Sequence, residues 1–90
     1  MKRRPAQNIV GPQIRQLRVR AGLTQDALAA KCGVAGWDVS RGTLAKIEAR
    51  VRCVTDAELF VLARVMKTDM GALFPHETAG IISMIRAKTR

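Results

Sequence analysis

The chain has 90 residues, enough for one domain with a single modest hydrophobic core. Sixteen lysines and arginines against seven acids give a formal net charge of +9, which favours a polyanionic partner such as nucleic acid. The apolar stretches are far shorter than the roughly 20 residues of a membrane-spanning helix, and the basic start lacks the apolar segment of a secretory signal. We therefore expect a cytoplasmic protein with no membrane partner.

The sequence offers no recognisable catalytic or metal centre. His76 is the only histidine and has no serine, cysteine or acid near it in a catalytic arrangement. Together with Cys32 and Cys53 it provides too few ligands for a zinc site, so the two cysteines are either reduced and partly buried or form a redox switch. Aromatic residues make up only 3% of the chain, which disfavours binding of single strands or RNA by base stacking. We expect no enzyme activity, no metal and no cofactor.

Residues 1–9 predict a flexible basic arm, because three cations and a proline occur there without an apolar period. The arm either reaches a neighbouring groove or acts as a disordered, solubilising tail. A first helix follows within a domain that we place at residues 10–75. Gly11 is its expected cap, Pro12 suits its first position, and Gly22 can take the positive φ that ends it.

A second helix is predicted to start after Thr24, a good N-cap, and to end at Gly33. Residues 34–39 follow without a clear period. We interpret them as a loop, with a one-turn extension of the second helix as the alternative. Trp37 lies in this stretch, and it either fills a gap beside the bundle or contacts a partner or effector.

Ser40 caps a third helix, in which Leu44 and Ile47 form a buried pair three positions apart. Gly42 lies inside this helix, where a glycine costs about 0.5–1 kcal/mol relative to alanine. It either allows a close approach to a backbone or ligand, or occupies a surface position without a role. The side chains left outside are those of Arg41, Thr43, Lys46 and Arg50.

Thr55 caps a fourth helix, whose apolar residues recur at helical spacing as far as Met66, and a short turn follows up to Pro75. Residues 76–90 form a C-terminal extension that could contain a short helix after Thr78. This extension either packs on its own domain or meets a partner. No strand signal appears, and the fold class is all-α.

Taken together, these positions resemble the helix-turn-helix of Cro and lambda-repressor proteins, the XRE-like family, over about residues 12–74. The residues that match its usual pattern are Leu17-Arg18, Gly22-Leu23-Thr24-Gln25, Leu28-Ala29, Gly33-Val34, Ser40, Thr43, Lys46-Ile47-Glu48 and Leu73-Phe74. The resemblance implies a compact bundle of about five short helices that binds operator DNA as a dimer to regulate transcription. The C-terminal helix would be additional.

Two positions depart from that family pattern. The buried aliphatic of the third helix usually lies six residues after the turn glycine, but here Leu44 lies eleven residues after Gly33. The turn therefore carries a five-residue insertion at 35–39. Arg50 stands where the family often ends the third helix with glycine.

The third helix of such a pair reads bases with its N-terminal residues, while the second helix crosses the backbone. We expect base contacts from Arg41, Gly42, Thr43 and Lys46, with Arg41 paired to guanine, although each could touch only phosphate. The expected phosphate contacts are Thr24, Gln25, Ser40, Arg50 and Arg52, because the start of the second helix favours an anion and the two arginines follow the third helix. By resemblance, Arg18 and Glu48 form a structural ion pair that orients the third helix.

The sequence therefore predicts a sequence-specific transcriptional regulator that inserts helix 40–50 in the major groove of an operator and binds double-stranded DNA as a homodimer. One alternative is an antitoxin-like or other protein-interaction module with a DNA-binding domain, in which residues 76–90 bind a protein partner. A second alternative is a non-specific basic nucleic-acid-binding protein.

Overall fold

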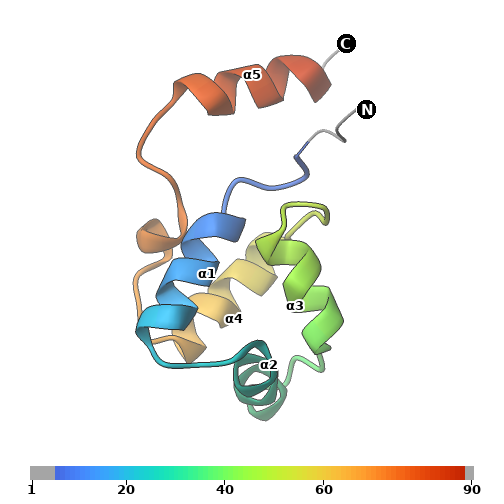
Figure 1. The fold of residues 1–90 in the computed structure, drawn as a ribbon, viewed down its shortest axis with the longest axis vertical. Helices are drawn as coiled ribbons and strands as arrows, with labels where there is room; N and C mark the ends of the chain where they lie inside the picture. The colour runs from blue at the N-terminus through green and yellow to red at the C-terminus, as the bar shows by residue number, and fades with distance from the viewer. Residues whose placement is uncertain (1–5, 89–90) are drawn as a thin grey trace.

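The computed structural model describes residues 6–88, and the regular secondary structure of this part of the chain is all helical, with no strand (Figure 1). The elements in chain order are α1 (Gly11–Arg20), α2 (Gln25–Val34), α3 (Arg41–Glu48), α4 (Asp56–Val65), a short 3-10 helix η1 (Met70–Leu73) and α5 (Ala79–Lys88). The expectation of an all-α bundle with an additional C-terminal helix is confirmed. Helices α1 to α4 and η1 pack together, whereas α5 lies beyond the bundle, on the side of the N-terminal segment (Figure 1).

The core is formed by apolar side chains from α1, α2, α3, α4 and η1. Those completely shielded from solvent are Ile14, Leu28, Cys32, Leu44, Ile47, Leu62 and Leu73. Burying a side chain of the size of leucine contributes about 1.5–3 kcal/mol. Because every helix from α1 to α4 contributes to this one cluster, the bundle fixes the position of α3 relative to α1 and α2.

Three of the helices start at a hydroxyl residue, as expected. Thr24, Ser40 and Thr55 each accept a hydrogen bond from the backbone N–H three residues later, at 3.0–3.1 Å. At α4 the cap is reciprocal, because the Glu58 carboxylate accepts a hydrogen bond from the Thr55 backbone N–H. Each such cap satisfies a backbone donor that the first helical turn leaves open.

The ends of the helices differ from the sequence prediction at one place. Gly22 ends α1 with φ +73°, as expected, but α2 continues past Gly33 to Val34, and Gly36 with φ +106° is the residue that ends it. The prediction that Gly33 ends this helix was wrong, because the helix runs one residue further, to Val34; residues 35–39 form a turn and a loop, as the main interpretation expected. The Trp37 N–H donates to the Cys32 carbonyl across this left-handed end, which closes the turn.

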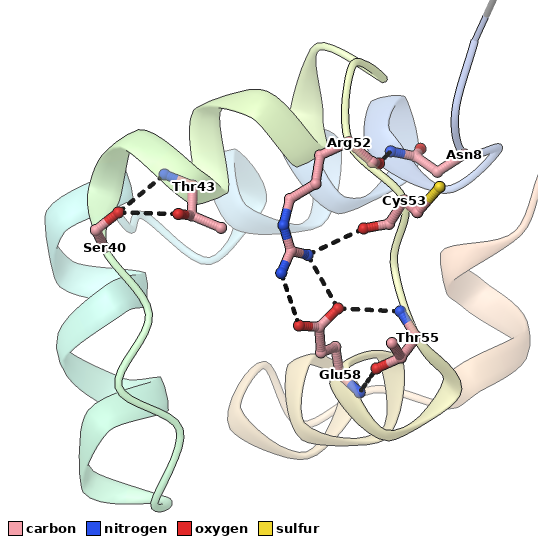
Figure 2. Close-up of polar contacts among 7 residues, drawn as sticks. All are labelled: Asn8, Ser40, Thr43, Arg52, Cys53, Thr55 and Glu58. Atoms are coloured by element: carbon pink, nitrogen blue, oxygen red, sulfur yellow. Dashed lines mark hydrogen bonds and ion pairs between the residues drawn. The ribbon is translucent and has the colours of Figure 1, made fainter.

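The inserted residues 35–39 thus form the end of the extended α2 and a segment that returns to the start of α3. In Figure 2 this segment leaves the far end of α2 and runs back to Ser40. Val39 is buried in the core and Trp37, half-buried, packs against it, which agrees with the gap-filling interpretation of the tryptophan. The insertion therefore leaves Leu44 and Ile47 in the core.

The predicted arm over residues 1–9 is corrected at its C-terminal end. The Gln7 N–H donates to the Arg50 carbonyl at 2.9 Å, and Asn8 is buried with 5% of its surface exposed. These two residues therefore belong to the bundle. Lys2, Arg3 and Arg4, the cations of the expected arm, lie outside the described residues.

Candidate nucleic-acid interface

Helix α3 is oriented by an ion pair with α1. Arg18 Nε lies 2.7 Å from Glu48 Oε2, Arg18 Nη2 donates to Glu48 Oε1 at 3.0 Å, and the two side chains are only 11% and 4% exposed. The hydrogen bond to Glu48 also raises the pKa of Arg18. Gln25 donates from its side-chain amide to the same carboxylate at 3.2 Å, so α1, α2 and α3 meet at one acid. The structure thus brings together Arg18 and Glu48 and turns this acid away from the surface of α3.

The C-terminal end of α3 is held by Asn8, a residue that the sequence analysis did not identify. Its side-chain amide donates to the carbonyls of Ile47 at 3.0 Å and Arg52 at 2.8 Å. Its Oδ1 accepts from the backbone N–H groups of Val10 at 3.1 Å and Gly11 at 2.9 Å. These four bonds use the full capacity of an amide side chain. Asn8 therefore caps α1 and fixes the end of α3 at the same time.

Gly11 was expected to cap α1, but it is the first residue of the helix. Val10 is the N-cap residue, and the Asn8 side chain, two residues before it, accepts the Gly11 N–H. The reason for a glycine here is space. A Cβ atom at this position would lie 2.5 Å from the Ile47 carbonyl oxygen, so only glycine lets α1 start directly against the end of α3.

Arg50 occupies the left-handed position after α3, with φ +65°. The backbone N–H of Arg50 donates to the Ile47 carbonyl, and that of Val51 donates to the Lys46 carbonyl, which completes the C-terminal motif usually built around glycine. The Arg50 side chain donates from Nε to the Asn8 carbonyl at 2.9 Å. Arg50 was expected to contact phosphate, but its guanidinium already holds the N-terminal segment against the end of α3.

At its N-terminus, α3 presents side chains to solvent. Ser40 Oγ accepts from the Thr43 N–H and donates to Thr43 Oγ1, both at 3.0 Å (Figure 2). Arg41, Gly42 and Lys46 are exposed on the surface of this helix. A Cβ atom at Gly42 would meet no atom closer than Ser40 Oγ at 3.8 Å, so the fold itself does not require glycine at this position.

The starts of α2 and α3 border one polar hollow. It is lined by Arg15, Arg18, Thr24, Gln25, Asp26 and Arg41. The structure thus brings the expected base reader Arg41 beside the two residues expected to bind phosphate at the start of α2. The open N–H groups and positive end of α2 favour an anion at this edge.

Arg52, a further expected phosphate contact, faces α4 instead. Its Nη1 and Nη2 pair with both oxygens of Glu58 at 3.0 Å, and Nη1 also donates to the Cys53 carbonyl (Figure 2). The hydrogen bond from Arg52 is the main cause that lowers the pKa of Glu58. A phosphate would have to compete with this paired carboxylate, so Arg52 is less available to DNA than the exposed Arg41.

The cysteines divide between core and surface, and neither forms a disulfide. Cys32 is buried, which raises the pKa of its thiol, whereas Cys53 is exposed. Among residues 6–88, no three side chains of His, Cys, Asp or Glu lie close enough together to hold a metal ion. None of the helices described is long and apolar enough to cross a membrane.

A family described as Helix-turn-helix matches residues 14–73, about two thirds of the chain. Searches of curated proteins and of solved structures each gave no significant match. The matched range starts at Ile14 in α1 and ends at Leu73 in η1, so it contains the ion pair, the Thr24 and Ser40 caps and almost all of the core. This is a family of DNA-binding helix-turn-helix domains of regulators. The chain belongs to the XRE/lambda-repressor-like helix-turn-helix family.

Proposed function

We propose that this protein is a sequence-specific transcriptional regulator that inserts the N-terminal half of α3 into the major groove of an operator. The observation that carries the proposal is a helix held firmly at its C-terminal end, with the outer surface of its N-terminal half open. The Arg18–Glu48 pair and the Asn8 amide fix α3, while Arg41 and Lys46 remain exposed. A rigid helix loses little conformational entropy on binding, which favours readout of base edges by a few precisely placed side chains.

The exposed residues of α3 suit distinct base contacts. The planar guanidinium of Arg41 can pair bidentately with guanine, worth about 1–3 kcal/mol of discrimination against other bases. The Thr43 methyl group suits a thymine methyl, and Lys46, one turn further on, can reach guanine or phosphate. Gly42 lets the groove edge approach the helix backbone. These four residues form the base-reading set of the proposal.

The phosphate contacts of the proposal surround this set. Thr24 and Gln25 present the start of α2 to one strand, and Ser40 begins the reading helix beside them. Arg50 and Arg52 lie beyond its other end. Since Arg50 and Arg52 already make intramolecular bonds, the start of α2 should carry more of the phosphate affinity than either arginine.

Selection of bound duplexes from a random library tests the proposal. We expect an enriched motif that beats random duplex by at least ~10³-fold at physiological salt. Arg41→Ala should lose about 5- to 150-fold affinity for that motif and relax preference at one base pair. Arg20→Ala, which removes an exposed arginine of α1, is the matched control and should keep the motif unchanged.

Two results would contradict specific regulation. One is a selection with no enriched motif. The other is an Arg41→Ala variant that weakens all duplexes equally, which would favour the alternative of a non-specific basic nucleic-acid-binding protein. Affinities should be compared at several salt concentrations, because contacts to phosphate alone follow the salt dependence of counterion release.

The protein partner in this proposal is a second copy on DNA, with half-sites about 34 Å apart, or another chain bound through residues 76–90. The apolar residues of α5 favour protein contact here, since Ile82 is 41% and Ile85 52% exposed. Truncation after Pro75, followed by sedimentation with and without operator, tests this. A dimer that survives truncation would remove α5 from the interface.

A further inference from the structure

A second surface, far from the start of α3, lies where the C-terminal ends of α2 and α4 meet. Its floor is apolar and consists of Ala30, Val34, Ala35 and Val65. Val34 is 91% exposed, the most exposed of the large apolar side chains described. Val34 and these apolar neighbours form a contiguous exposed apolar patch, and such patches mark sites of interaction.

The last residues of α2 contribute to the groove, together with Ala35, the first residue of the insertion. Val34 is the last residue of α2 and Ala35 its C-cap, and both lie beyond Gly33, where the family pattern ends this helix. The C-terminal end of α2 thus forms part of a surface that the DNA-reading part of the fold does not use.

The rim of this groove is cationic. Lys31, Arg64 and Lys67 line it, and no acid is among the residues that do. Asp69 borders a neighbouring hollow together with Arg64 and Lys67. It is therefore the acid of this chain that could pair with these two cations. On α4 the apolar surface continues to Phe60, 53% exposed, with the Arg64 guanidinium 5.5 Å above its ring.

Stabilisation of helix ends explains only part of this arrangement. Lys31 and Arg64 lie in the last turns of α2 and α4, where cations offset the negative end of the helix dipole. Lys67 lies past the end of α4, in a left-handed conformation at φ +55°, and an exposed Val34 has no such role. An apolar floor between cations is complementary to a segment that is apolar on one side and acidic along its flanks.

We propose that this groove docks an acidic amphipathic helix of a partner protein. Apolar side chains one turn apart on the partner would lie on Val34 and Val65, and flanking carboxylates would pair with Lys31, Arg64 and Lys67. DNA does not suit this floor, because its backbone offers phosphates and no apolar side chains. The groove also lies at the opposite end of α2 from Thr24, about 15 Å away for a helix of this length.

Docking there leaves the reading surface of α3 uncovered. A partner bound between α2 and α4 would therefore remain attached while the protein occupies DNA. The docking itself does not depend on DNA binding, and only the ternary complex rests on the proposed function. Arg41→Ala separates the two, because it should weaken motif binding and relax preference at one base pair while it leaves the groove intact.

The test uses the full chain and a displayed library of 16-residue helical peptides, with glutamate or aspartate fixed along the flanks and varied apolar residues on one face. Enriched peptides are titrated into isotopically labelled protein. We expect saturable amide shifts around Ala30, Val34 and Val65. Binding should fall at least 10-fold for Lys67→Glu and for Val34→Ser, and should be unchanged for the matched surface control Arg20→Glu.

Peptide controls complete the design. A charge-reversed peptide with lysine flanks and one with serine in place of its apolar residues should each lose binding. The proposal is overturned if no library member binds more tightly than about 1 mM, or if the charge-reversed peptide binds equally well. It also fails if the groove variants change self-association or DNA affinity rather than peptide binding, since the occupant would then be a second copy or DNA. Circular dichroism checks that each variant is folded.

Discussion

Replacing Asn8 tests whether the end of the reading helix is held from the N-terminal segment. Asn8→Ala removes two hydrogen bonds to carbonyls and two from the first N–H groups of α1. At about 1 kcal/mol for each bond, with part of the loss recovered by water, the free energy of unfolding should fall by about 2–4 kcal/mol. A domain of this size has about 5–13 kcal/mol in total, so the midpoint of thermal unfolding should fall by on the order of 10–30 °C.

Asn8→Asp separates capping from clamping. Aspartate caps a helix about as well as asparagine, so a residue that only capped α1 would tolerate the change. Here the new oxygen would face the carbonyl oxygens of Ile47 and Arg52, which lie 3.0 and 2.8 Å from the present amide nitrogen. Asp should therefore destabilise at least as much as Ala in urea unfolding followed by circular dichroism. An Asn8→Asp protein within about 0.5 kcal/mol of the parent would refute the clamp.

Three further predictions concern α3 and α4. Arg18→Met should cost about 3–5 kcal/mol in urea unfolding, because it strands the buried Glu48, and adding Glu48→Leu should recover most of that loss. Gly42→Ala should stabilise the fold by about 0.5–1 kcal/mol, and its operator affinity should fall if the groove edge approaches this position. Because Arg52 lowers the Glu58 pKa below its ordinary 4.5, the stability lost in Arg52→Gln should be largest above pH 4.5 and vanish as pH falls through the lowered value.

Features with a local physical cause could be predicted from the sequence. Thr24, Ser40 and Thr55 start helices because their hydroxyl groups reach an amide only three residues away. The buried pair Leu44 and Ile47 follows from helical spacing, which does not depend on what packs against it. The same applies to the all-α fold and to the C-terminal helix.

Features that depend on distant contacts could not be predicted in this way. Asn8 bonds to residues 39 and 44 positions away, and nothing next to it in the sequence distinguishes it from the basic arm. Arg50 takes a left-handed conformation that the sequence would favour only for glycine, because the end of α3 and the Asn8 carbonyl hold it there. The expectation of a free Arg52 ignored Glu58, since the pairing of the two is set by how the loop meets α4.

The extended α2 has a consequence for how this domain could change over time. The chain leaves α2 at Gly36 and runs back to Ser40, so the residues added beyond Gly33 extend away from the start of α3 and then return to it. The entropy of closing such a loop grows only slowly with its length. Residues could therefore be gained or lost at the exposed Gly36 without shifting Val39 or the start of α3. The tip of α2 is thus a place where new surface can be acquired while the reading helix stays under separate selection.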